Sequence, residues 1–501
     1  MPSPDFLLGR ASAVAEASLP IKEEAKWKWS VYPFLFSLYP VLFLYLRNIH
    51  EVRLAQVFRA AIVSLGIAVA CWFLTGVLSK QRSKRSLVLF LFLLLFHFYG
   101  LYYDQIAGLL PQTSRPLRAH LLAFILPGTI WLALTIIVVR SKRGFAALHR
   151  VLQTAVLLLL TWNIGGIAIH HAGLLFDHSR QSWAGKQHLP AIQTRTPDIY
   201  CFVLDEFAAP ESARSLFGYD NGAFVASLRR QGFFVAEQSR SLYILTEPAI
   251  AAILNLGVFS DQEDPFQLIH RNAVAALLKN GGYRIIEFAS LHSLFMKAAD
   301  QRFYYHLVHV SIFFDDFYRA LFERSLLRVL PDLWQLEKTD LLRYYRKRIL
   351  QVFEELPAIV KTLGPKFVYI HLFSPHEPFI FDQKGELVDP GHIWDHSDPR
   401  YYLGQYIYIS HRMLETAAMI IANSPAAPVI IMQSDHGYRG SKRPGNESKP
   451  ISPSEMIRVF NALYLPDIPL NGIQPSLSPL NNFRLVFNSY FGTRYPLLHN
   501  P

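Results

Sequence analysis

Cysteine is almost absent from this chain of 501 residues, which has only Cys71 and Cys201. Two cysteines so far apart, each in an apolar stretch, offer neither a disulfide framework nor a cysteine metal site. Acidic residues are also scarce in the first part, where residues 1–195 carry 20 Lys and Arg against 7 Asp and Glu. The net charge of +11 therefore belongs to this part, and we expect no nucleic-acid partner.

A cleavable signal peptide is not expected, because residues 1–20 lack an apolar core flanked by basic residues. Long apolar runs are abundant instead, and five of them have about the length of a membrane-spanning helix. They are Val31–Leu46, Val57–Leu78, Leu87–Tyr103, Leu121–Val139 and Val151–Ile169. The sequence therefore predicts a multi-pass helical membrane region over residues 1–171, with the first span as a signal anchor.

Basic residues between these runs predict the orientation of the chain. Clusters at Lys80–Arg85 and Arg140–Arg150 follow the second and fourth runs, and Lys22, Lys26 and Lys28 precede the first. Since basic loops stay in the cytoplasm, five spans deliver everything beyond a linker at 172–196 to the opposite face. We expect a protein of the inner or plasma membrane with an extracytoplasmic domain over residues 197–501.

The second half alternates apolar strands with longer helical patterns. Strands are predicted at Ile199–Leu204, Phe233–Ala236, Arg284–Phe288 and Lys366–Leu372, and after Pro428. Helices are predicted at Asn221–Arg230, Thr246–Leu256, Pro265–Lys279, Phe317–Leu326, Leu341–Val360 and Pro399–Asn423. This alternation predicts a layered α/β domain with a mostly parallel sheet.

Polar residues follow two of these strands where the strands end. The apolar run P-V-I-I-M-Q-S-D-H-G ends in Asp435 and His436, and the first strand ends in Asp205 and Glu206. Ligands gather at the carboxyl ends of strands in open α/β sheets, and a carboxylate and an imidazole can share one cation. The alternative is an ordinary strand-end turn with solvated side chains.

Thr246 and two histidines extend this pattern. Thr246 begins a predicted helix, where its usual role is an N-cap. The same position offers a hydroxyl beside free N–H groups that favour a phosphate, and a metal would help ionise the hydroxyl. His371 and His376 follow a third strand and are either structural hydrogen-bonding groups or parts of the same site.

Together, these stretches resemble the alkaline phosphatase superfamily, in the sulfatase-like branch of lipoteichoic acid synthases and lipid A phosphoethanolamine transferases. Pro197–Glu206 looks like the first metal-binding strand of that branch. Phe217–Ala236 and Asn481–Thr493 look like segments of membrane-bound sulfatase-like proteins of unassigned substrate. The resemblance covers residues 195–498 and implies an alkaline-phosphatase-like domain.

The resemblance also implies a divalent metal site. Its ligands would be Asp205, with Glu206 as the alternative, Thr246, Asp435 and His436. Three oxygens and one nitrogen suit Zn²⁺ or Mn²⁺ and do not reject Mg²⁺ or Ca²⁺.

For catalysis, the resemblance makes Thr246 the nucleophile. His376 would contact the transferred phosphoryl group or protonate a leaving oxygen, and His371 is a second candidate for the same region.

Two features depart from the pattern of the transferases, and one pattern of true sulfatases occurs by chance. The next histidine after His436 is His499, so the further histidine that is usual in the transferases is missing or replaced. Their disulfides are excluded by the two distant cysteines. The formylglycine pattern of sulfatases occurs only at Ser114–Arg118, between two predicted spans, where we regard it as a coincidence.

We therefore expect a metal-dependent phosphotransferase or phosphohydrolase that acts on a phosphodiester through a covalent phospho-threonine. The donor would be a membrane phospholipid, and the acceptor a glycan or lipid of the cell envelope. The alternatives are a sulfatase-like hydrolase of soluble sulfate or phosphate esters, and a non-catalytic envelope binding protein.

Overall fold

The computed structural model describes residues 31–49, 52, 54–110, 115–176, 196–260, 263–288, 294–303, 316–330, 337–389, 391–396, 398–440 and 450–499. They form two compact units. The membrane unit draws on Met1–Leu46, Val57–Gly166 and Glu323–Leu326, and the α/β unit on the rest. The basic residues Lys22, Lys26 and Lys28, the serine of the pattern at Ser114, and positions 177–195 of the predicted linker lie outside the described residues.

Each of the predicted apolar runs forms a helix of the membrane unit. The helices are α1 (Tyr32–Arg47), α2 (Leu54–Leu78), α3 (Arg82–Gly108), α4 (Arg115–Arg140) and α5 (Ala146–Phe176). Within the described residues, four of these helices are long and apolar enough to cross a bilayer. α1 is a shorter apolar helix of 16 residues. A multi-pass helical region is therefore confirmed, with four or five spans.

The basic residues expected after the second span do not form a loop. Arg82, Lys84 and Arg85 lie in the first turn of α3, where Lys84 Nζ donates to the carbonyl of Val139 at 2.8 Å. The guanidinium of Arg85 lies 4.1 Å from the centre of the Trp72 ring. Their charge can still orient the chain, and the side of the membrane on which they lie stays a prediction.

The α/β unit is built on a sheet of seven described strands in the order β2-β7-β6-β1-β5-β3-β4. The strands are β1 (Ile199–Leu204), β2 (Phe234–Val235), β3 (Arg284–Phe288), β4 (Gln301–Phe303), β5 (Lys366–Leu372), β6 (Val429–Ser434) and β7 (Asn461–Tyr464). Only the pairs that involve β7 are antiparallel. The mostly parallel sheet predicted from the sequence is confirmed, and β1 is its central strand.

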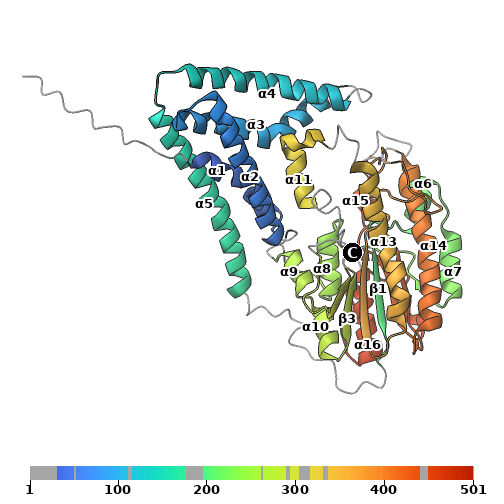
Figure 1. The fold of residues 1–501 in the computed structure, drawn as a ribbon. Helices are drawn as coiled ribbons and strands as arrows, with labels where there is room; N and C mark the ends of the chain where they lie inside the picture. The colour runs from blue at the N-terminus through green and yellow to red at the C-terminus, as the bar shows by residue number, and fades with distance from the viewer. Residues whose placement is uncertain are drawn as a thin grey trace, which may run out of the picture. The chain divides into compact units, whose positions relative to one another are not determined.

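Helices cover both faces of this sheet (Figure 1). Tyr200, Phe202 and Leu204 of β1 pack toward α6 (Pro210–Phe217), α7 (Gly222–Arg230), α13 (Glu337–Val360) and α14 (Pro399–Asn423). Residues 199, 201 and 203 pack toward α8 (Thr246–Leu254), α9 (Pro265–His270), α10 (Ala273–Asn280) and α16 (Asn482–Phe491). Because β1 is buried on both faces, its side chains are apolar throughout.

Some elements differ from the prediction. The helix expected over 265–279 is two helices, because Asn272 accepts from the N–H of Ala275 and caps α10. Strands β4 and β7 were not predicted, and neither was the short helix α15 (Pro453–Met456). Asp316–Arg324 forms α11.

Candidate active site

Three adjacent parallel strands deliver the predicted site residues to one edge of the sheet. β1 pairs with β5 on one side and with β6 on the other, and Leu204 is in register with Leu372 and Ser434. Asp205 and Asp435 each come one residue after these positions. Parallel strands end at the same edge, so residues more than 200 positions apart in sequence meet there.

Asp205, Asp435 and His436 form one buried group, and each is 0% exposed. Nε2 of His436 lies 3.5 Å from Oδ1 of Asp205 and 3.4 Å from Oδ2 of Asp435. Nδ1 of His436 lies 2.8 Å from the carbonyl oxygen of Gly437. Since a carbonyl can only accept, Nδ1 carries the proton and Nε2 presents a lone pair to the group.

Thr246 joins this group through its hydroxyl. It is the first residue of α8, and its Oγ1 lies 3.2 Å from Nε2 of His436. The N-cap position belongs to Leu245, and no side-chain hydrogen bond caps this helix. The helix-cap role considered for Thr246 is therefore wrong, and its hydroxyl contacts the imidazole of His436.

Gly437 allows a close backbone contact behind this group. Its N–H donates to the carbonyl of Met456 at 2.6 Å, and a Cβ on Gly437 would lie 2.5 Å from the carbonyl oxygen of Arg458. The glycine after Asp435 and His436 is thus required by close packing, which excludes any side chain at this position.

The donor set fits a divalent cation. Among the described residues, no hydrogen bond reaches either carboxylate oxygen of Asp205 or Oδ2 of Asp435. Ligands held tetrahedrally at about 2.0–2.1 Å from a metal lie roughly 3.3–3.4 Å apart. The three distances from Nε2 of His436, at 3.2, 3.4 and 3.5 Å, match that spacing. Buried carboxylate oxygens that accept no hydrogen bond are unfavourable unless a positive charge offsets them.

Asp205 also lies close to histidines. Nε2 of His371, in β5, is 3.3 Å from Oδ2 of Asp205. Burial by itself would raise the pKa of Asp205, but the charges of His376 and His371 outweigh the effect of burial and hold the pKa below its usual range. Asp205 is therefore an ionised carboxylate inside the protein.

A second polar group adjoins the first and contains Glu206, His376 and Glu377. Nε2 of His376 lies 3.9 Å from Glu206, and Nε2 of His396 lies 3.0 Å from Glu377. Burial would lower the pKa of His376, but Asp205, Glu206 and Glu377 raise it to about 9. Hydrogen bonding to Glu377 raises the pKa of His396 as well. The structure thus groups Glu206, which is itself buried, with His376 rather than with Asp205 and Asp435.

Arg439 is a site residue that the sequence did not predict. Its backbone N–H donates to Oε1 of Glu206 at 2.6 Å, and its Nη2 lies 3.2 Å from Nε2 of His376. An arginine in a loop has no local pattern that marks it as functional. Its position three residues after His436 was the only available signal.

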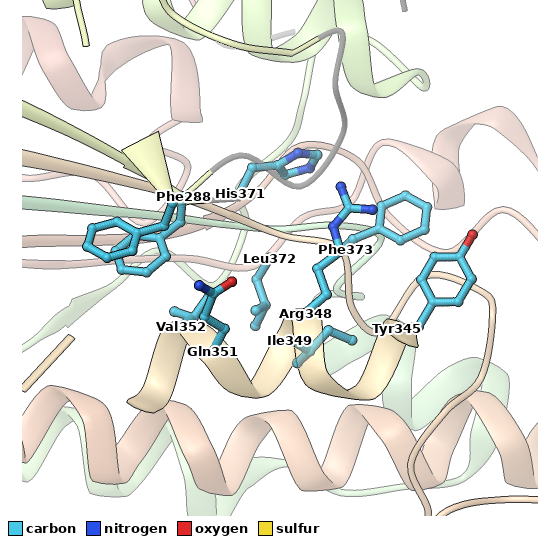
Figure 2. Close-up of a pocket in the computed structure, with 10 residues that line it drawn as sticks. Phe288, Tyr345, Arg348, Ile349, Gln351, Val352, His371, Leu372 and Phe373 are labelled. Carbon is cyan, nitrogen blue, oxygen red and sulfur yellow. The ribbon is translucent and has the colours of Figure 1, made fainter. Parts of the chain in front are cut away.

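A small pocket borders His371 (Figure 2). It is lined by Phe288, Leu372 and Phe373 at the ends of strands and by Ile349 and Val352 of α13. Its volume of about 20 Å³ holds about one water molecule. We therefore do not regard it as a substrate site.

Comparisons with known proteins find similar solved structures. No protein-family model and no curated protein matches the chain. The integral membrane protein lipooligosaccharide phosphoethanolamine transferase A of Neisseria meningitidis is 12% identical, with a TM-score of 0.43 over 92% of this chain and 95% of that one. The C-terminal periplasmic domain of EptC from Escherichia coli is 13% identical, with a TM-score of 0.41 over 62% and 87%.

A protein of the alkaline phosphatase superfamily from Vibrio parahaemolyticus is 16% identical, with a TM-score of 0.37 over 63% of this chain and 72% of that one. The last of these proteins is described as a member of the alkaline phosphatase superfamily, which the sequence motifs resemble. All of them are distant, so we base the function on the residues of this chain.

Proposed function

We propose that this protein is a metal-dependent phosphotransferase of the membrane, and that Thr246 carries the transferred group. One observation carries the proposal. The hydroxyl of Thr246 lies 3.2 Å from Nε2 of His436, within a set of fully buried carboxylates that accept too few hydrogen bonds. A helix-terminal hydroxyl beside a cation site is suited to act as a nucleophile.

The metal ligands would be Asp205, Asp435, His436 and the hydroxyl of Thr246. Glu206 is the less suitable ligand, since its Oε1 already accepts from the N–H of Arg439. We favour Zn²⁺ or Mn²⁺ for this mixed set of oxygens and nitrogen. When bound, the ion would lower the pKa of the hydroxyl and offset charge on the phosphoryl group.

Residues of the chain account for the other parts of the reaction. Thr246, having lost its proton to water, attacks phosphorus, and a bond from Oγ1 to phosphorus forms. The bond from phosphorus to the leaving oxygen breaks, and that oxygen keeps the electron pair and takes a proton from His376. In the second half an acceptor hydroxyl displaces Thr246 and returns a proton to His376. His371 would position Asp205, which it approaches at 3.3 Å.

Exposed apolar residues beside Thr246 support a lipid donor. Leu242, Ile244 and Leu245 directly precede the nucleophile and are 37%, 39% and 48% exposed. Apolar side chains gathered at a surface indicate contact with another apolar partner. Together with the apolar helices of the same chain, this supports a membrane phospholipid as donor and an envelope lipid or glycan as acceptor.

Intact mass measurement tests the proposal. The purified full-length protein, loaded with Zn²⁺ or Mn²⁺, is incubated with micelles that contain phosphatidylethanolamine and phosphatidylglycerol. We expect a covalent headgroup adduct on Thr246 and none on a folded Thr246→Ala variant. Turnover of a phosphodiester by Thr246→Ala at the parental rate would refute the covalent mechanism.

The location of the α/β unit is tested separately. We propose that it lies outside the cytoplasm, as five spans with basic cytoplasmic ends require. A reporter fused after Pro501 should be active only in an extracytoplasmic compartment. Activity confined to the cytoplasm would favour four spans, with the short α1 outside the membrane.

A further inference from the structure

Arg439 lies between the segment that precedes the nucleophile and the second polar group. Its Nη1 lies 3.4 Å from the carbonyl oxygen of Ile244, two residues before Thr246, and its Nη2 lies 3.2 Å from Nε2 of His376. The backbone N–H of Arg439 is fixed by Oε1 of Glu206 at 2.6 Å. The guanidinium therefore lies between the start of α8 and the side chain of His376.

No carboxylate among the described residues pairs with this guanidinium, and its buried Nε has no acceptor. Two other arginines of the α/β unit do pair with carboxylates. Arg229 lies 2.7 Å from Glu237, and Arg458 lies 2.9 Å from Glu211. Nε of Arg346 lacks an acceptor as well, so the position of Arg439 distinguishes it: its guanidinium lies between the segment before Thr246 and His376. A buried donor without an acceptor lowers stability, and an anion bound at this position would supply one.

We propose that Arg439 is a further catalytic residue, whose guanidinium binds a non-bridging oxygen of the phosphoryl group received by Thr246. This inference rests on the proposed function. The anion that arrives between Thr246 and His376 is the phosphodiester itself. The planar guanidinium offers Nε and Nη donors in a fork that matches two phosphate oxygens.

Arg439 takes no part in making or breaking bonds. The bond from Oγ1 of Thr246 to phosphorus forms and the bond to the leaving oxygen breaks, while the non-bridging oxygens stay on phosphorus. A fixed positive charge beside those oxygens stabilises the transition state, in which negative charge spreads over them.

Two measurements on the full-length, metal-loaded protein test this role. The first is the affinity for inorganic phosphate, measured by calorimetry. The second is the single-turnover rate of adduct formation on Thr246 from phosphatidylethanolamine in micelles. Arg439→Ala should bind phosphate about 10-fold or more weakly and form the adduct about 100-fold more slowly. Arg439→Lys should be intermediate, because it keeps the charge and loses the fork.

Three controls separate a catalytic role from a structural one. Arg229→Ala removes a surface guanidinium that already has a partner and should behave as the parent does. Arg439→Ala keeps the backbone N–H that Glu206 accepts, so its metal content should not change. Added guanidinium ion should restore part of the rate in Arg439→Ala and none in Thr246→Ala.

Each outcome decides the inference. Unchanged phosphate affinity in Arg439→Ala, or a parent that binds no phosphate, would overturn it. If the parent binds phosphate but forms no adduct with any lipid, the proposed function fails, and the phosphate affinities still decide the role of Arg439. If Arg439→Ala does not fold, Arg439→Lys decides. Parental phosphate affinity and a parental rate of adduct formation in Arg439→Lys would overturn the role of the forked guanidinium.

Discussion

The two polar groups at the edge of the sheet differ in how their carboxylates find partners. In the buried group, both oxygens of Asp205 and one oxygen of Asp435 accept no hydrogen bond from the described residues. In the second group, Glu206 accepts from the N–H of Arg439, and Glu377 pairs with His396 at 3.0 Å. The buried group is therefore the one that fits a cation, whereas the carboxylates of the second group already have partners within the chain.

Removing a charge from the buried group should have the largest effect. Asp435→Asn keeps an oxygen that can accept from the N–H of Glu206, which now donates to Asp435 at 3.2 Å. It removes one of the charges that would hold a cation, so we expect loss of most bound metal. Adduct formation should fall by about 1,000-fold or more. Metal content and the single-turnover rate are the measurements.

Glu206→Gln is the matched control in the second group. The amide oxygen of the new side chain can still accept from the N–H of Arg439, and we expect this variant to retain stoichiometric metal. If Glu206→Gln loses the metal while Asp435→Asn keeps it, the assignment of the two groups is reversed.

His376→Gln should have the next largest effect on adduct formation. We expect a fall of about 100- to 1,000-fold in adduct formation, as is typical for the loss of a proton donor, with unchanged metal content. p-Nitrophenolate, the leaving group of a p-nitrophenyl phosphodiester, needs no proton. With that substrate, the rate of adduct formation by His376→Gln should be closer to the rate of the parent. Loss of metal from His376→Gln would show that the two groups form one site.

Gly437→Ala should disturb both groups at once, because Gly437 lies between His436 and Arg439. Its Cβ would clash with the carbonyl oxygen of Arg458, and relief of that clash must move the backbone. We expect a loss of about 1–3 kcal/mol in unfolding free energy and weaker binding of both metal and phosphate. Thermal unfolding with and without metal measures the effect, and a variant as stable as the parent would mean that the segment is free to shift.

The smallest effect is expected from Glu377→Gln. Burial would raise the pKa of Glu377, but pairing with His396 and His376 lowers it. The same pairing with Glu377 raises the pKa of His396. The carboxylate contribution is present above the usual pKa of Glu and is lost as the pH falls through the lowered value. The imidazolium contribution is present below the usual pKa of His and is lost as the pH rises through the raised value.

Between the lowered pKa of Glu377 and the raised pKa of His396, both members of the pair are therefore charged. Glu377→Gln should reduce the unfolding free energy by about 1 kcal/mol near pH 6 and by less in more alkaline solution. A series of thermal unfolding curves against pH is the measurement, and an effect that grows with pH would contradict this pairing.

Much of the α/β unit was predictable because its central strands are short, apolar and bounded by polar residues. β1, β3, β5 and α14 have the predicted limits. β7 was missed because N-A-L-Y is only four residues long and starts with a buried asparagine, whose side chain bonds Asn482. The break between α9 and α10 depends on one capping side chain, which the apolar pattern of the helices does not reveal.

The convergence of Asp205, Asp435, His436 and Thr246 was expected from the resemblance, and the structure brings these four residues together. Arg439 could not be found in this way. The role proposed for it rests on contacts with Glu206, His376 and Ile244, which are distant in sequence and meet it only in the folded chain.

The register of β1 against β6 limits how this protein can change over evolution. Asp205 and Asp435 each follow the last paired residue of their strand, so the lengths of the two strands set the position of both carboxylates. Inserting or deleting one residue in either strand would move its carboxylate by about 3.3 Å and turn it to the opposite face of the sheet. Substitutions that keep these strands apolar should be tolerated, whereas single-residue insertions and deletions within them should be eliminated by selection.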